Sequence, residues 1–229
     1  MGFLDELKRQ AAAQTAQQNQ NASANQRNAM LADAACKTAF QYWLQLAAQL
    51  NVLRPKARAS YVIDKRHRLE GLPLSDVRVD ARLKAERLTS AHGDAGYDHV
   101  VLQFMLRSGQ HLTLKKNFLN EIEQLEGRLR QAGIRADTEA VRHPENGKLQ
   151  EMRYAFDADI AASVLLTPDH ANARVHFQLR NLDALETVSF DVPAFDVGSA
   201  RLDELAKWLV GEPHEFLKGV HKLRRVEAP

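Results

Sequence analysis

The chain has 229 residues, of which 45% are apolar and 26% are charged, and a formal net charge of +2. This composition is ordinary for a globular protein, and the length suffices for one large domain or two small ones. The net charge is too small to indicate a nucleic-acid-binding protein by itself.

Cys36 is the only cysteine, so no intramolecular disulfide can form, which fits a reducing compartment. The N-terminal residues lack the basic-then-apolar order of a secretory signal. No run of 18 apolar residues predicts a transmembrane helix. We therefore expect a cytoplasmic protein without integral membrane insertion.

Residues 1–53 predict one long helix, because they contain no proline and only one glycine, Gly2. From Met30 onward, an apolar stripe at helical spacing predicts packing on a core. The residues of this stripe are Cys36, Phe40, Trp43, Ala47 and Leu50.

The first half of this helix has too little apolar area to bury itself. No charged residue occurs from Gln10 to Gln26, and Asn19 to Asn25 is the weakest helical stretch, so the order of residues 10–28 stays open. The segment could project into solvent, be disordered or meet another chain. We expect contact with another copy or another protein through Phe3, Leu4 and Leu7, in preference to a membrane surface, because Asp5 and Glu6 oppose anionic lipid.

Arg54-Pro55 ends the helix, and residues 54–73 read as a basic linker with a short strand at 60–63 and a turn at 69–73. Its cations could extend onto the next strand and bind an anion or an acidic partner. The candidate residues of this site are Lys65, Arg66, His67, Arg68, Arg78 and Arg82. Acidic residues interrupt the patch, and no exposed aromatic residues for base stacking are evident. We favour a solvated loop between helix and sheet over a binding site here.

Residues 74–229 predict an α+β domain. Apolar and charged residues alternate over 75–88, which predicts a strand with one solvent-exposed face, and residues 91–96 are predicted to form a loop. Residues 97–107 and 111–115 then predict a hairpin in which Phe104 pairs with Leu112 and Leu102 with Leu114. A helix follows at 117–132, with Asn117 as its N-cap, Phe118 on its apolar stripe and Gly133 as its stop.

After Gly133, alternating segments predict further strands at 135–142, 152–156, 160–167, 175–179 and 188–192. An amphipathic helix is expected at 199–210, and Pro213 opens a last short helix that leads into a basic tail. Segments 74–133 and 134–211 each read as strands followed by a helix, so a duplicated unit is one interpretation.

No motif in the sequence carries chemistry. The nine histidines show no metal-ligand spacing, Cys36 lies on the apolar helix stripe, and glycine loops for phosphate are missing. We assign no catalytic residue, cofactor or metal, and we do not favour an enzyme. An active site that converges from distant strands stays open.

The sequence thus predicts an α+β protein with a long N-terminal helix, a mainly antiparallel sheet of about seven or eight strands and amphipathic helices packed on it. The expected function is a non-enzymatic cytoplasmic binding or assembly protein that forms a homo-oligomer or binds another protein through the helix. One alternative is a small apolar ligand or lipid bound between sheet and helices. The other is nucleic-acid binding through the basic segment 54–84.

Overall fold

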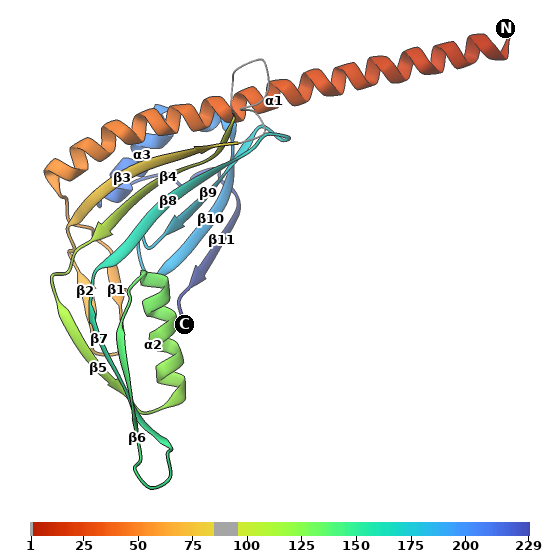
Figure 1. The fold of residues 1–229 in the computed structure, drawn as a ribbon. Helices are drawn as coiled ribbons and strands as arrows, with labels where there is room; N and C mark the ends of the chain where they lie inside the picture. Colours follow the sequence, from red (N-terminus) through yellow and green to blue (C-terminus); the bar gives the residue numbers. More distant parts are fainter. Residues whose placement is uncertain (1, 85–95) are drawn as a thin grey trace.

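The computed structural model describes residues 2–84 and 96–229, and the side chains of residues 3–5 are not described. Three α-helices, one 3-10 helix and eleven strands occur in this part of the chain (Figure 1). The helices are α1 (Phe3–Leu53), α2 (Leu119–Ala132), η2 (Ala194–Asp196) and α3 (Ser199–Leu209). The strands are β1 (Ser60–Val62), β2 (Arg68–Glu70), β3 (Leu74–Leu83), β4 (Tyr97–Leu106), β5 (His111–Lys116), β6 (Asp137–Arg142), β7 (Leu149–Asp157), β8 (Ile160–Asp169), β9 (Arg174–Arg180), β10 (Glu186–Pro193) and β11 (His221–Glu227).

Helix α1 is continuous over 51 residues and ends as the sequence predicts, at Leu53 before Arg54 and Pro55. Its second half lies across the sheet in Figure 1, while its first half projects beyond the body. The predicted stripe is confirmed: Cys36, Trp43, Ala47 and Leu50 are buried, and Phe40 is partly buried against the same core.

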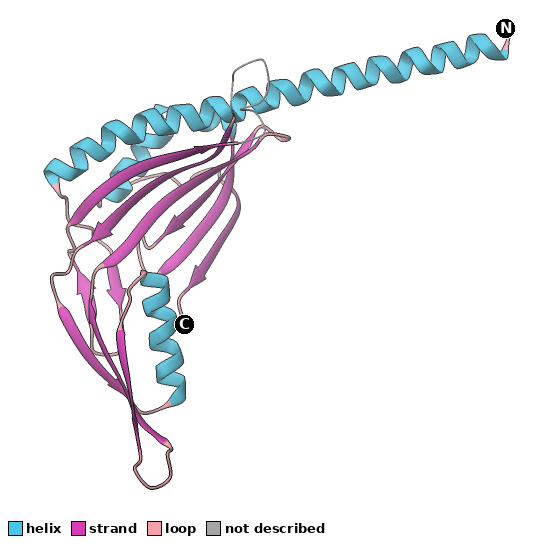
Figure 2. Ribbon diagram, viewed as in Figure 1, coloured by secondary structure: helices cyan, strands magenta, loops and turns pink. Residues whose placement is uncertain are grey.

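The main sheet has six antiparallel strands in the order β11-β10-β9-β8-β4-β3. Helices α1 and α3 cover one face of it (Figure 2). Alternate residues of β4, namely Val100, Leu102, Phe104 and Leu106, point into this core, as their two-residue period predicts. We call the opposite face the open face. Among the described helices, only α2 approaches it, at the lower end of the sheet in Figure 1.

A second sheet has three strands in the order β5-β7-β6, and β1 and β2 form a two-stranded sheet. Helix α2 packs its buried residues Ile122, Leu125 and Leu129 here, next to Tyr154 of β7. The α+β class, with the long N-terminal helix and antiparallel sheets, is therefore confirmed, and the strands divide between a large sheet and two small ones.

The predicted β4–β5 hairpin is wrong. Strand β4 pairs with β3 and β8, and β5 pairs with β7, so Leu102 lies opposite Val164 and Leu114 opposite Tyr154. The physical reason is that the β4–β5 connection and the β7–β8 connection both pass between the six-stranded and the three-stranded sheet, and they do so side by side. At this crossing the Ala158 amide donates to the Gln110 carbonyl at 2.9 Å. Residues 97–116 therefore run antiparallel to residues 149–166 as one bent ladder.

Two details of the predicted helices also need correction. Helix α2 begins at Leu119 with Phe118 as its N-cap, so Asn117 does not cap it, and Phe118 is 69% exposed because it precedes the buried stripe. The predicted short C-terminal helix is wrong, since Gly219 has a φ of +71° and residues 221–227 form β11. Strand β11 pairs with β10. Without β11, β10 would be an edge strand with unpaired backbone groups.

Segment 54–73 is more than a linker, because Tyr61, Ile63, Leu69 and Leu72 belong to the buried core. Strand β3 confirms the predicted strand as far as Leu83, while the expected strand residues 85–88 and the expected loop at 91–95 lie outside the described residues. The duplication stays a prediction. Strand β4 of the first segment lies between β3 and β8, so the two segments share one sheet.

None of the helices that the structure describes combines the length and the hydrophobicity needed to cross a membrane.

Candidate functional site

The basic loop between β1 and β2 is organised around Asp64. His67 Nδ1 and Lys116 Nζ lie 2.8 Å and 2.9 Å from its carboxylate oxygens, and the Arg66 amide donates to it at 2.9 Å. Partial burial acts to raise the pKa of Asp64, but these hydrogen bonds outweigh burial and hold that pKa well below its usual range. The loop is thus fixed by a carboxylate.

Most of the loop cations already have acidic partners. Lys65 lies 3.4 Å from Glu121 of α2, and Arg68 lies 3.9 Å from Glu70. Arg66 is exposed. These pairs reduce the positive charge that the sequence predicts for the loop, and anion binding there stays a prediction.

Arg78 and Arg82 lie elsewhere, on the open face of the main sheet. Both are exposed residues of β3, opposite Gln103 and His99 of β4 respectively. The structure therefore does not join these two arginines to the loop residues through any contact that it describes.

A groove of about 550 Å³ runs over the open face beside Arg78. Its floor comes from β4 and β8, which contribute the uncharged polar side chains of Gln103 and Ser163. The charged residues of its lining are Asp76, Arg78, Arg107 and Arg180. Val101, Met105 and Ala161 supply apolar surface. The volume lies within the usual range for small-molecule sites.

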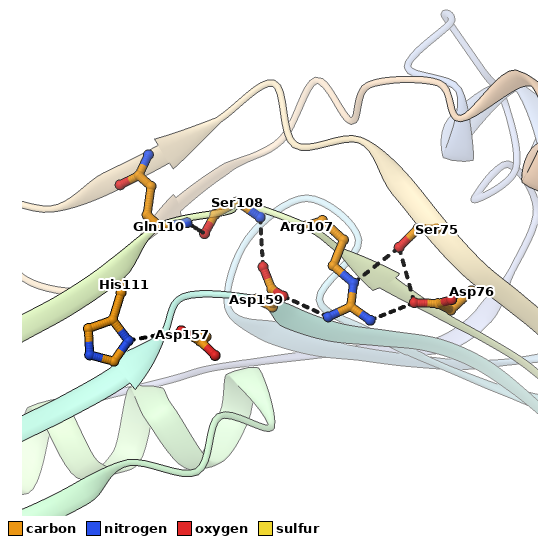
Figure 3. A network of polar contacts seen from close by, with 8 residues as sticks. All are labelled: Ser75, Asp76, Arg107, Ser108, Gln110, His111, Asp157 and Asp159. Carbon is orange, nitrogen blue, oxygen red and sulfur yellow. Dashed lines mark hydrogen bonds and ion pairs between the residues drawn. The ribbon is translucent and has the colours of Figure 1, made fainter.

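Asp76 and Arg107 of the lining belong to a polar network centred on Arg107. Figure 3 shows this network. The guanidinium donates to Asp76 at 2.6 Å and to Asp159 at 2.7 Å, while the Ser108 amide donates to Asp159 at 2.8 Å. Hydrogen bonds to Asp159 and Asp76 raise the pKa of Arg107. Close by, His111 Nδ1 lies 2.9 Å from an Asp157 carboxylate oxygen. Arg107 is therefore a structural cation whose three guanidinium nitrogens each donate one bond within the protein.

Arg180, which lines the groove, is anchored to the C-terminus of α2. Arg180 donates to the carbonyl oxygens of Arg130 and Gln131 at 2.6 Å each, where the helix dipole favours a cation. Gly133 ends α2 with a φ of +74°, and a Cβ placed there would lie 2.9 Å from the Cβ of Ala161. A glycine is required at this position for both reasons.

A second cavity, of about 300 Å³, lies between segment 57–61, the main sheet and α3. Leu74 and Phe104 line it from the sheet, and Trp208 lines it from α3. The ring of His214 stacks on Trp208 with centroids 4.4 Å apart. His214 Nδ1 is buried without a hydrogen-bond partner among the described residues.

We call the first half of α1, residues 3–27, the arm. The Leu7 side chain is 44% exposed, whereas the side chains of Phe3 and Leu4 are not described. No described side chain of the arm is buried, and the first buried residue of α1 is Ala32. Attachment of α1 to the body begins at Asn28, whose side-chain amide donates to the Ala171 carbonyl at 2.7 Å.

Sequence reasoning found Arg78 and missed Gln103, Ser163 and Arg180. The alternation of β4, β8 and β9 marks these three side chains as facing away from the core. Only the register of the sheet shows that they lie side by side.

Comparisons of the chain with protein-family models, curated proteins and solved structures gave no match.

Proposed function

We propose that the protein is a non-enzymatic cytoplasmic binding or assembly protein that self-associates through the arm. The observation that carries this proposal is the continuity of α1, whose second half is a core element and whose first half has no buried side chain among those that the structure describes. Because the helix is anchored in the core, the body presents the arm in one fixed direction.

The surface of the arm indicates the kind of partner. Residues 10–26 carry no charge, so this stretch offers nothing to a phosphate backbone. Helices that are polar all round need additional support to stay helical in water. In the arm that support includes bonds such as Gln17 Nε2 to Asn21 Oδ1 at 3.2 Å, which are weak in isolation. The alanines of the arm are small and allow close approach of another helix, and the side-chain amides of its glutamines and asparagines can form hydrogen bonds with that helix. A second copy of the arm fits these properties.

The test is the mass of the protein in solution by light scattering. We expect the full chain to be an oligomer and a chain that begins at Met30 to be a folded monomer. In the full chain, Gln18→Pro breaks the arm and is expected to give the monomer as well, while Gln18→Ala keeps the oligomer. A monomeric full chain, or a truncated chain of unchanged assembly state, would refute the proposal.

A second candidate function is binding of a small apolar ligand in the 300 Å³ cavity. The unpartnered His214 Nδ1 favours it, because a ligand oxygen could bond to this buried atom. Native mass spectrometry of the purified protein checks this candidate. A bound molecule that is lost in Leu74→Trp, which fills the cavity, supports it, and a protein that is free of ligand contradicts it.

A further inference from the structure

Four polar side chains lie in one row across the open face. The register places Arg78 of β3 opposite Gln103 of β4, Gln103 opposite Ser163 of β8, and Ser163 opposite Arg180 of β9. All four line the groove. The backbones of Arg78 and Arg180 are three strand spacings apart, a distance of roughly 14 Å. The two arginines therefore lie on opposite sides of a groove that has the size of a small-molecule site.

Three of the four side chains in this row have unused hydrogen-bonding capacity. Within residues 2–84 and 96–229, the side chains of Arg78, Gln103 and Ser163 form no hydrogen bond or ion pair with the protein. Their five guanidinium donors, amide group and hydroxyl face the groove or the solvent around it. A ligand could therefore bind them without displacing a protein contact.

The charge of the groove is positive. Arg180 donates to carbonyl oxygens and has no carboxylate partner among the described residues. The one acidic residue of the lining, Asp76, is paired with Arg107 at 2.6 Å. Asp80, the next outward residue of β3, accepts a bond from the Ala81 amide and does not line the groove. An anion is thus the ligand that this charge pattern complements.

The remaining surface of the groove is apolar. Val101 and Met105 lie two residues on either side of Gln103, and Ala161 lies opposite Met105 on β8. These side chains can cover the hydrocarbon or aromatic part of a ligand.

We propose that this groove binds an anionic amphipathic small molecule. Its acidic group is held by Arg78 and its polar atoms by Gln103 and Ser163, while its apolar part lies on Val101 and Met105. The site is independent of the arm, because no residue of α1 lines the groove.

The experiment uses 1-anilinonaphthalene-8-sulfonate, a fluorescent anionic probe with apolar rings, in titrations of the full chain. We expect saturable binding that weakens at least tenfold in Arg78→Gln. Gln103→Glu, which places a negative charge in the floor of the groove and retains its size, is expected to weaken binding to a similar extent. Thermal melting of each variant verifies that it is folded.

Arg82→Gln is the matched control, because it removes the same charge from the same face of β3 outside the groove. We expect it to change the affinity less than twofold. The neutral probe N-phenyl-1-naphthylamine is expected to bind equally to the wild-type protein and to Arg78→Gln. Unchanged binding of the anionic probe in both Arg78→Gln and Gln103→Glu, or equal losses in Arg78→Gln and Arg82→Gln, would overturn the proposal.

Discussion

The guanidinium of Arg107 and the carboxylate of Asp159 form an ion pair of 2.7 Å that joins the two places where the chain passes from one sheet to the other. Arg107 follows β4, and Asp159 precedes β8. Asp76, at the irregularity of β3, accepts from the same guanidinium. One side chain therefore links three strands of the main sheet at the junction of the sheets (Figure 3).

Asp159→Asn should destabilise the protein. The carboxylate is 19% exposed and accepts bonds from Arg107 and from the Ser108 amide, so loss of its charge is expected to lower the free energy of unfolding by about 1–3 kcal/mol. Urea denaturation measures this change. Asp157→Asn, two residues away and 81% exposed, is the control and should cost less than about 0.5 kcal/mol. Equal effects of the two variants would show that the ion pair of Arg107 contributes nothing specific.

Acid should remove stability that depends on Asp64. The pKa of this group is lowered in the folded protein, so its stabilisation is complete above the unfolded value of about 3.9 and is lost as the pH falls from there through the folded pKa. Melting temperatures between pH 6 and pH 2 should therefore fall less steeply in Asp64→Asn than in the wild type. Asp137→Asn, an exposed strand residue, should retain the wild-type slope. The prediction fails if Asp64→Asn and the wild type lose stability in parallel.

Gly133→Ala should destabilise the protein more than Gly147→Ala. Both glycines have a positive φ, which costs an alanine about 1–2 kcal/mol. Only at Gly133 would the new Cβ meet another atom, the Cβ of Ala161 at 2.9 Å, and the resulting overpacking adds about 1–3 kcal/mol. Chemical denaturation gives both values. A double variant with Ala161→Gly should recover the added cost, and no recovery would argue against the contact.

Cys36 should be unreactive in the folded protein. Burial is the main cause that raises the pKa of its thiol to about 12, so only about one molecule in ten thousand carries a thiolate at pH 8. Ellman's reagent should detect no thiol in the native chain and one thiol after unfolding in guanidinium chloride. Rapid reaction of the native protein would contradict this burial.

The parts of the fold that depend on neighbouring residues could be predicted from the sequence. The stripe from Cys36 to Leu50 and the alternation around Leu102 follow from the periods of helix and strand, which local spacing reveals. The end of α2 at Gly133 follows from the left-handed conformation that glycine adopts most easily. Such features require no knowledge of the partner element.

The strand pairing and the groove could not be predicted, because they depend on contacts between distant residues. Leu102 lies opposite Val164, and a nearby strand at 111–116 was an equally good partner by pattern alone. The C-terminal residues Val220 and Leu223 suit a helix by spacing, but a strand there completes the pairing of β10. The row from Arg78 to Arg180 needs the register of four strands, each of which the sequence leaves free to slide by two residues.

The length of α1 has a consequence for how the two proposed surfaces can work together. At the rise of an α-helix, the full helix is roughly 75 Å long and the arm accounts for roughly 40 Å of it. A partner that bound near Leu7 would therefore stand well away from Arg78 and the open face. If both proposals hold, this separation lets a second copy on the arm and an anion in the groove be bound at the same time without steric competition.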